Sequence, residues 1–134
     1  KTAALAKERG LRGKELPVAG AYHSRLMISA QEKLRAELTG VALSVPAFPV
    51  VCNLEALPVA EAAEIRRTLE LQVTGSVRWA QSMEYLLAQG HDCFLELGPG
   101  GQLAGMLGRI RKGVEVHSVS DPASLEKAVA ALAS

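Results

Sequence analysis

Residues 92–97 (Asp-Cys-Phe-Leu-Glu-Leu) form a nearly continuous apolar segment, and Gly98-Pro99-Gly100-Gly101 follows it at once. This glycine turn leads directly into residues 102–111, whose composition predicts a helix, and residues 114–119 then form another short apolar segment. A strand, a glycine turn, a helix and a further strand are typical of α/β proteins, in which helices connect parallel strands. This succession therefore predicts an α/β fold.

The remaining elements fit between these. We expect a strand over residues 48–52, because this segment is short, rich in valine and has proline near its start. Together with the segments at 92–97 and 114–119 it should form a parallel sheet covered by helices on both faces. Helices are predicted at residues 1–9, 25–39, 59–71, 77–89 and from Pro122 to residue 132, where Ser120 or Asp121 would be the N-cap. In the second of these helices, an apolar stripe of Leu26, Ala30, Leu34 and Leu38 should pack against a neighbour.

The charge and cysteine content exclude several classes of partner. The chain has 134 residues with 15 Lys and Arg against 14 Asp and Glu, so no strong field of one sign would attract nucleic acid or an anionic membrane. The apolar runs are too short to span a bilayer. Two well-separated cysteines without a secretory leader favour a reduced, cytoplasmic protein. The first helix has no cap residue before it and no initiating methionine, so we expect further sequence upstream.

Two segments could bind a cofactor or a metal, and neither pattern is complete. The glycine turn resembles a dinucleotide-binding loop, but Leu103 stands where a third glycine belongs and Pro99 removes an amide donor. A structural tight turn is the favoured interpretation. His91 and Cys93 could ligate a metal, but no third or fourth ligand lies near them in the sequence. We therefore expect neither a metal nor a cofactor.

His23 is the candidate for proton transfer. It ends the mainly apolar run Pro17–Tyr22 and stands just before a predicted helix. A histidine in such a place can act as a general base, although a packed, hydrogen-bonded histidine is the more frequent outcome for position alone. None of the 134 residues forms a Gly-x-Ser-x-Gly elbow that would expose a nucleophilic serine. The chain looks like half of an active site.

Four segments, taken in order, resemble one known family. They are Leu16–Met27, Phe48–Asn53, Val77–Trp79 and Phe94–Gly100. Their sequences and order are similar to the carboxy-terminal part of the bacterial malonyl-CoA:acyl carrier protein transacylases, the acyltransferases of type II fatty acid synthesis. Gly98-Pro99-Gly100 resembles the stand-alone enzymes, whereas acyltransferase domains of modular polyketide synthases usually have Gly-Pro-His at this point.

The resemblance implies a domain organisation. Such enzymes have a large α/β-hydrolase-like domain that carries a serine in a Gly-His-Ser-x-Gly elbow, and a small ferredoxin-like domain inserted before the catalytic histidine. Residues 1–15 would be the end of the small subdomain, and residues 16–134 the carboxy-terminal part of the large domain. The serine, the arginine that clamps the malonate carboxylate and the amino-terminal oxyanion donors would lie in a missing amino-terminal portion.

The resemblance also assigns roles to residues. His23 would be the catalytic base, held by a main-chain carbonyl that we place at Gln72. Tyr22 would narrow the acyl pocket toward malonyl, and Ser24 and Asn53 would line the same cleft. The substrates would be malonyl-CoA and the phosphopantetheine thiol of acyl carrier protein, with no cofactor. Two alternatives stay open: an acyltransferase domain of a polyketide synthase, and a non-catalytic binding or scaffold module of the same fold.

Overall fold

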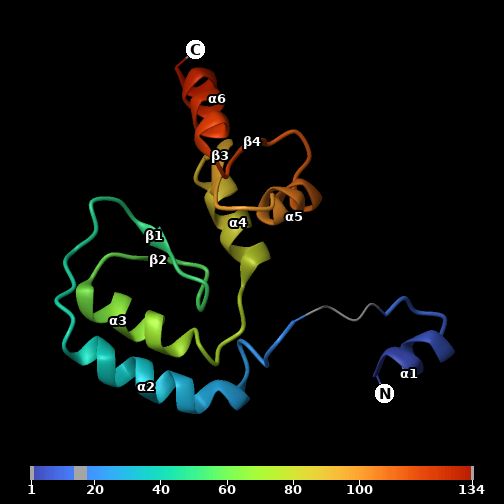
Figure 1. Cartoon of the computed structure of the whole chain (residues 1–134), viewed down its shortest axis with the longest axis vertical. Coiled ribbons are helices and arrows are strands. Elements are labelled where there is room, and N and C mark those ends of the chain that lie inside the picture. The colour runs from blue at the N-terminus through green and yellow to red at the C-terminus, as the bar shows by residue number, and fades with distance from the viewer. Residues whose placement is uncertain (1, 14–17, 134) are drawn as a thin grey trace.

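The structure, a computed structural model, describes residues 2–13 and 18–133 (Figure 1). In chain order its elements are α1 (Thr2–Glu8), the short 3-10 helix η1 (Arg25–Met27), α2 (Ile28–Thr39), β1 (Val50–Val51), β2 (Pro58–Val59), α3 (Ala62–Leu71), α4 (Trp79–Ala88), β3 (Cys93–Leu97), α5 (Gln102–Ile110), β4 (Glu115–Val119) and α6 (Pro122–Leu132).

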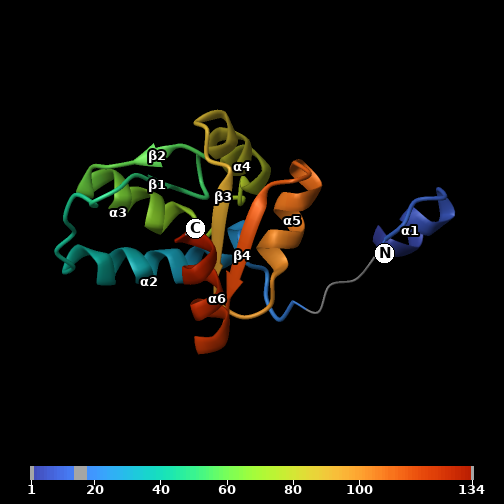
Figure 2. The same cartoon turned by 90° about the horizontal axis from the view of Figure 1, so that it is seen from above.

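The succession of strand, glycine turn, helix and strand forms as predicted. Strands β3 and β4 pair in parallel, with a register that runs from Cys93 opposite Glu115 to Leu97 opposite Val119. Helix α5 connects them, and α6 packs against β4 (Figure 2). The prediction of an α/β fold is confirmed.

The prediction for residues 48–52 is wrong in two respects. Only Val50 and Val51 form a strand, and this strand pairs antiparallel with β2 rather than joining β3 and β4. Pro49 has no N–H to donate to a ladder, which limits how far the pairing can extend. The side chain of Phe48 is 72% exposed. Within the described residues, the parallel sheet therefore has two strands, not the three expected.

The predicted helix over residues 25–39 is interrupted near its start. Residues 25–27 form η1, and α2 begins only at Ile28. Leu26 is 74% exposed, so it does not continue the apolar stripe that Leu38, 8% exposed, anchors at the other end. Helix α2 packs along α3, and the polar residue Gln31 is buried between them.

Helix α6 forms where the local sequence predicts it, from Pro122 to Leu132. Asp121 is the N-cap of α6, and its Oδ1 accepts a hydrogen bond of 2.8 Å from the amide of Ser124. Ser124 Oγ in turn accepts one of 3.0 Å from the amide of Asp121, which completes a capping box with Pro122 at the first helical position.

The chain exposes much more surface than a compact protein of its size. Its accessible surface is 10196 Å², whereas a compact monomer of 14.2 kDa exposes roughly 6,800 Å². In both views α1 lies apart from the other elements (Figures 1 and 2). The expected boundary between residues 15 and 16 lies outside the described residues. None of the described helices is long and apolar enough to cross a bilayer.

Candidate active site

His23 lies in a tight turn and has an unusual backbone conformation. Its φ is +56°, in the left-handed region that residues other than glycine seldom occupy. Ser24 stabilises this turn: its hydroxyl donates a hydrogen bond of 2.6 Å to the carbonyl of Ala21 and accepts one of 3.3 Å from the amide of Leu26. Backbone strain of this kind persists only where the surroundings enforce it, and it concentrates at functional sites.

The imidazole of His23 is held from one side. Its Nδ1 lies 2.8 Å from the main-chain carbonyl oxygen of Gln72. A carbonyl oxygen can only accept, so Nδ1 carries the proton and donates it. In the neutral ring the lone pair is then on Nε2, which is the nitrogen that can accept a proton from a substrate or nucleophile.

A polar network fixes the segment that presents the Gln72 carbonyl. Gln72 is the C-cap of α3, and its amide donates to the carbonyl of Thr68 at 3.0 Å. Just beyond it, the hydroxyl of Thr74 donates to Gln31 Oε1 at 2.6 Å, and Gln31 Nε2 donates to Glu70 at 3.1 Å. The buried amide of Gln31 on α2 therefore ties both sides of Gln72 to the neighbouring helix. Nothing in the sequence indicated that Gln31 has this position.

An ion pair adds to the same contact between α2 and α3. Arg35 donates two hydrogen bonds to Glu70 Oε1, from Nε at 2.8 Å and from a terminal nitrogen at 2.6 Å. The hydrogen bond from the guanidinium lowers the pKa of the Glu70 carboxyl, which keeps that group ionised as an acceptor for Gln31 as well.

An open pocket lies beside the imidazole. It is lined by Tyr22, His23, Met27, Gln72 and Val73. The structure thus brings together three of the residues chosen from the sequence, and adds Met27 and Val73, for which no role was predicted. The ring of Tyr22 is 59% exposed, so it can border a bound acyl group.

The other two candidates, Asn53 and Ser24, do not line this pocket. Asn53 Nδ2 donates to the side-chain oxygen of Gln72 at 3.2 Å, and Asn53 lines a neighbouring groove that shares Gln72 with the pocket. Ser24 contributes to neither lining, and its hydroxyl is engaged in the turn around His23. Its direct contact with a substrate remains a prediction.

The glycine turn after β3 serves a structural purpose. The carboxylate of Glu96 accepts hydrogen bonds from the amides of Leu103 at 2.9 Å and Ala104 at 3.1 Å, and from the hydroxyl of Ser118 at 3.2 Å. These two amides belong to the first turn of α5. A phosphate bound at this helix N-terminus would need the same amides as hydrogen-bond donors. Gly101 has a φ of +72°, which lets the chain enter the helix close to the sheet. The helix start is already satisfied by the protein itself.

In the intact gene product, Glu96→Gln should lower the melting temperature by about 2–4 °C near neutral pH, because a neutral amide is a weaker acceptor for these donors. The hydrogen bonds, first that from Leu103, lower the pKa of Glu96 below its ordinary 4.5. A lowered pKa stabilises the fold above pH 4.5, and this stabilisation is lost as the pH falls through the folded-state value. Thermal melts of both proteins between pH 3 and 7 should therefore converge at the acidic end. A difference that stays constant with pH would contradict this role of the carboxylate.

The prediction that no further metal ligand lies near Cys93 is wrong. His91 is exposed and belongs to no cluster of metal-ligating side chains within residues 2–13 and 18–133, whereas Cys93 has two neighbours of this kind, Glu115 and His117. They come from β4, which the sequence places more than twenty residues away. Burial, and then the carboxylates of Glu115 and Asp92, raise the pKa of the Cys93 thiol.

Known proteins resemble this chain over most of its length. The chain is 36% identical over 129 residues to the malonyl CoA-acyl carrier protein transacylase of Bacillus subtilis, which covers 96% of this chain and 41% of that relative. It is 40% identical over 100 residues to the polyketide biosynthesis malonyl CoA-acyl carrier protein transacylase of the same organism. This match covers 75% of this chain and 34% of that relative. No family model matches the chain.

A solved structure agrees with these relatives. A malonyl-transacylase in complex with its type II PKS acyl-carrier protein superposes with a TM-score of 0.88 at 35% identity, over 96% of this chain and 42% of that one. The chain thus spans about two fifths of the length of the relatives that it matches most fully.

Proposed function

Because this chain is similar, over nearly all of its length, to the carboxy-terminal portion of the malonyl-CoA:acyl carrier protein transacylases, we propose that it supplies the histidine base of such an enzyme. The whole protein would transfer a malonyl group from malonyl-CoA to the phosphopantetheine thiol of acyl carrier protein. The observation that carries the proposal is the 2.8 Å contact between His23 Nδ1 and the carbonyl oxygen of Gln72.

The first half-reaction loads the enzyme. A serine hydroxyl is a weak nucleophile at neutral pH, so a base must take its proton as it attacks the malonyl thioester. His23 Nε2 accepts this proton while the serine oxygen bonds to the carbonyl carbon. The bond from carbon to the CoA sulfur then breaks, and Nε2 returns the proton to the departing thiolate. The product is a malonyl ester of the serine.

The second half-reaction transfers the malonyl group from the serine to the carrier protein by the same kinds of step in reverse order. The phosphopantetheine thiol gives its proton to Nε2 and attacks the ester, a bond forms from sulfur to carbon, and the bond to the serine oxygen breaks. The proton returns to that oxygen. Each half-reaction makes an imidazolium for a moment, and the Gln72 carbonyl dipole stabilises the charge while it keeps the ring oriented.

The remaining catalytic groups are proposed to lie in an amino-terminal portion outside this chain. They are the serine nucleophile, the oxyanion donors and the arginine for the malonate carboxylate. The chain alone, with no Gly-x-Ser-x-Gly elbow in its 134 residues, would be inactive.

The proposal is tested with the intact gene product, malonyl-CoA and a phosphopantetheinylated carrier protein. Mass spectrometry of the carrier should show the gain of one malonyl group, with the unmodified apo-carrier as the matched control that stays unchanged. A carrier that gains no malonyl at any enzyme concentration would favour the non-catalytic scaffold.

Polyketide synthesis is a second candidate pathway, because one relative at 40% identity carries that name. Gly100 stands where modular polyketide synthases usually have histidine, which favours the stand-alone fatty acid enzyme. Transfer rates to the carrier proteins of both pathways from the same organism would decide between them.

Tyr22→Ser should increase turnover of methylmalonyl-CoA relative to malonyl-CoA, because the ring that borders the pocket beside His23 is removed. A gain of about tenfold in relative kcat/KM corresponds to roughly 1.4 kcal/mol, within the range for one methyl group in a pocket. Tyr22→Phe keeps the ring and should keep the preference. Unchanged methylmalonyl turnover in Tyr22→Ser would refute the role of Tyr22 in selectivity.

A further inference from the structure

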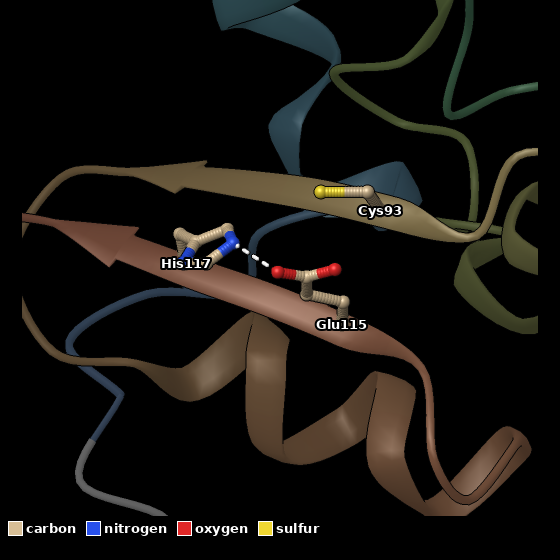
Figure 3. Close-up of side chains that lie close together, drawn as sticks. All are labelled: Cys93, Glu115 and His117. Carbon is tan, nitrogen blue, oxygen red and sulfur yellow. Dashed lines mark hydrogen bonds and ion pairs between the residues drawn. The ribbon is translucent and has the colours of Figure 1, made fainter. Parts of the chain in front are cut away.

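Three potential metal ligands lie together on the sheet formed by β3 and β4. They are Cys93 on β3 and Glu115 and His117 on β4, and Figure 3 shows their side chains on the face of the sheet that points away from α5. None of them lines the pocket at His23.

The register of the two strands creates this cluster. Cys93 pairs directly with Glu115, and His117 follows two residues later, so it points to the same face. The Sγ, carboxylate oxygen and ring nitrogen all lie within 4.8 Å of one another. A tetrahedral zinc ion with ordinary bond lengths separates its ligand atoms by roughly 3.3–3.7 Å. Small side-chain rotations would bring the three donors to that spacing, because the strands already fix their backbones.

The donor set selects a class of cation. A thiolate, an imidazole and a carboxylate together suit zinc, whereas magnesium and calcium prefer oxygen ligands alone. The two anionic ligands would balance the charge of a divalent ion. We propose that Cys93, Glu115 and His117 bind zinc or a similar thiol-seeking divalent cation.

Binding rearranges contacts that are present in the structure. His117 Nε2 and Glu115 Oε1 now share a hydrogen bond of 2.8 Å, and the metal would replace the proton between them. Cys93 would bind as a thiolate, with its proton released to solvent. The side chain of Glu115 is 59% exposed, so an ion can reach the cluster from solvent. With three protein ligands, the fourth position would hold water, and the ion would link β3 to β4.

The test is a titration of the intact gene product, prepared free of metal, with Zn²⁺ followed by calorimetry. We expect one ion per chain at this cluster. Changing a second-shell group typically weakens metal binding 10–100-fold, so removal of a ligand in Cys93→Ser or His117→Gln should weaken it by at least about 100-fold. Cys52→Ser and His91→Gln are matched controls that should bind as the wild type does. Equal binding by the wild type and Cys93→Ser would overturn the proposal.

A second measurement needs no variant and so does not depend on variant folding. Co²⁺ bound to a thiolate gives an intense charge-transfer absorption, which should appear on titration of the wild type and disappear when Zn²⁺, but not Mg²⁺, is added. Zn²⁺ should also slow alkylation of Cys93, mapped by peptide mass spectrometry, while Cys52 reacts at an unchanged rate. Absence of both the thiolate absorption and the protection of Cys93 would overturn the proposal and leave only the hydrogen bond between His117 and Glu115 at this cluster.

Discussion

Replacing His23 by alanine in the intact gene product should lower the kcat of the proposed malonyl transfer by about 10²- to 10⁴-fold, the usual contribution of a positioned general base. The imidazole that takes the proton from the nucleophile is then missing in both half-reactions. The measurement is the initial rate at which malonyl appears on holo-carrier protein, at saturating malonyl-CoA. His91→Ala, which removes an exposed histidine outside the site, should keep the wild-type rate.

A merely structural histidine would behave differently, and His23→Asn separates the two roles. Asparagine tolerates a positive φ and can donate from its amide to the Gln72 carbonyl, but it cannot act as a base. We expect His23→Asn to fold normally by circular dichroism and to be as inactive as His23→Ala. Recovery of activity in the asparagine variant would show that the 2.8 Å hydrogen bond, and not proton transfer, is what the enzyme requires of His23.

The second large effect concerns residues 1–134 expressed alone: they should show no detectable malonyl transfer and should self-associate. The chain lacks the serine elbow, and it exposes large apolar side chains, among them Leu97 at 76%, Leu26 at 74% and Phe48 at 72%. Strand β3 pairs only with β4 in the described part of the chain, so its other edge has backbone groups available for another chain. Exposed apolar surface next to an open edge favours aggregation.

Light scattering coupled to gel filtration, together with calorimetry, tests this expectation, and the intact gene product is the control. We expect species larger than a monomer and no sharp heat-absorption peak for residues 1–134. A monomer that unfolds in one cooperative transition would show that these residues form a self-sufficient core, in contradiction to the large surface that the structure exposes.

The parts of the fold that were predictable depend on local signals. The turn Gly98-Pro99-Gly100-Gly101 and the capping box at Asp121 are complete within a few residues, and α5, β4 and α6 follow them as expected. Strand β2 could not be foreseen, because Pro58 and Val59 are too few for a pattern and pair with β1 only through a turn that includes Ala56 at a φ of +59°. Tertiary pairing decided that hairpin, not propensity.

The candidate site also contains residues that the sequence predicts and residues that it does not. His23 stood out by its position, but the partnership with Gln72, 49 residues away, was expected only from the resemblance to a family and not from any spacing. The buried Gln31 gave no signal, because a single polar residue on a helix usually faces solvent. The cluster of Cys93, Glu115 and His117 depends on strand register, which cannot be obtained from a single sequence.

The most direct test of the central claim is to find where the malonyl group rests on the enzyme. The intact gene product is mixed with malonyl-CoA without carrier protein, quenched, and analysed by intact mass and peptide mapping. We predict one malonyl ester, on a serine that precedes Lys1 of this chain, and a much slower appearance of it in His23→Ala. A malonyl group attached to a residue within 1–134, or no malonyl-enzyme at all, would contradict the proposal that this chain provides the base and not the nucleophile.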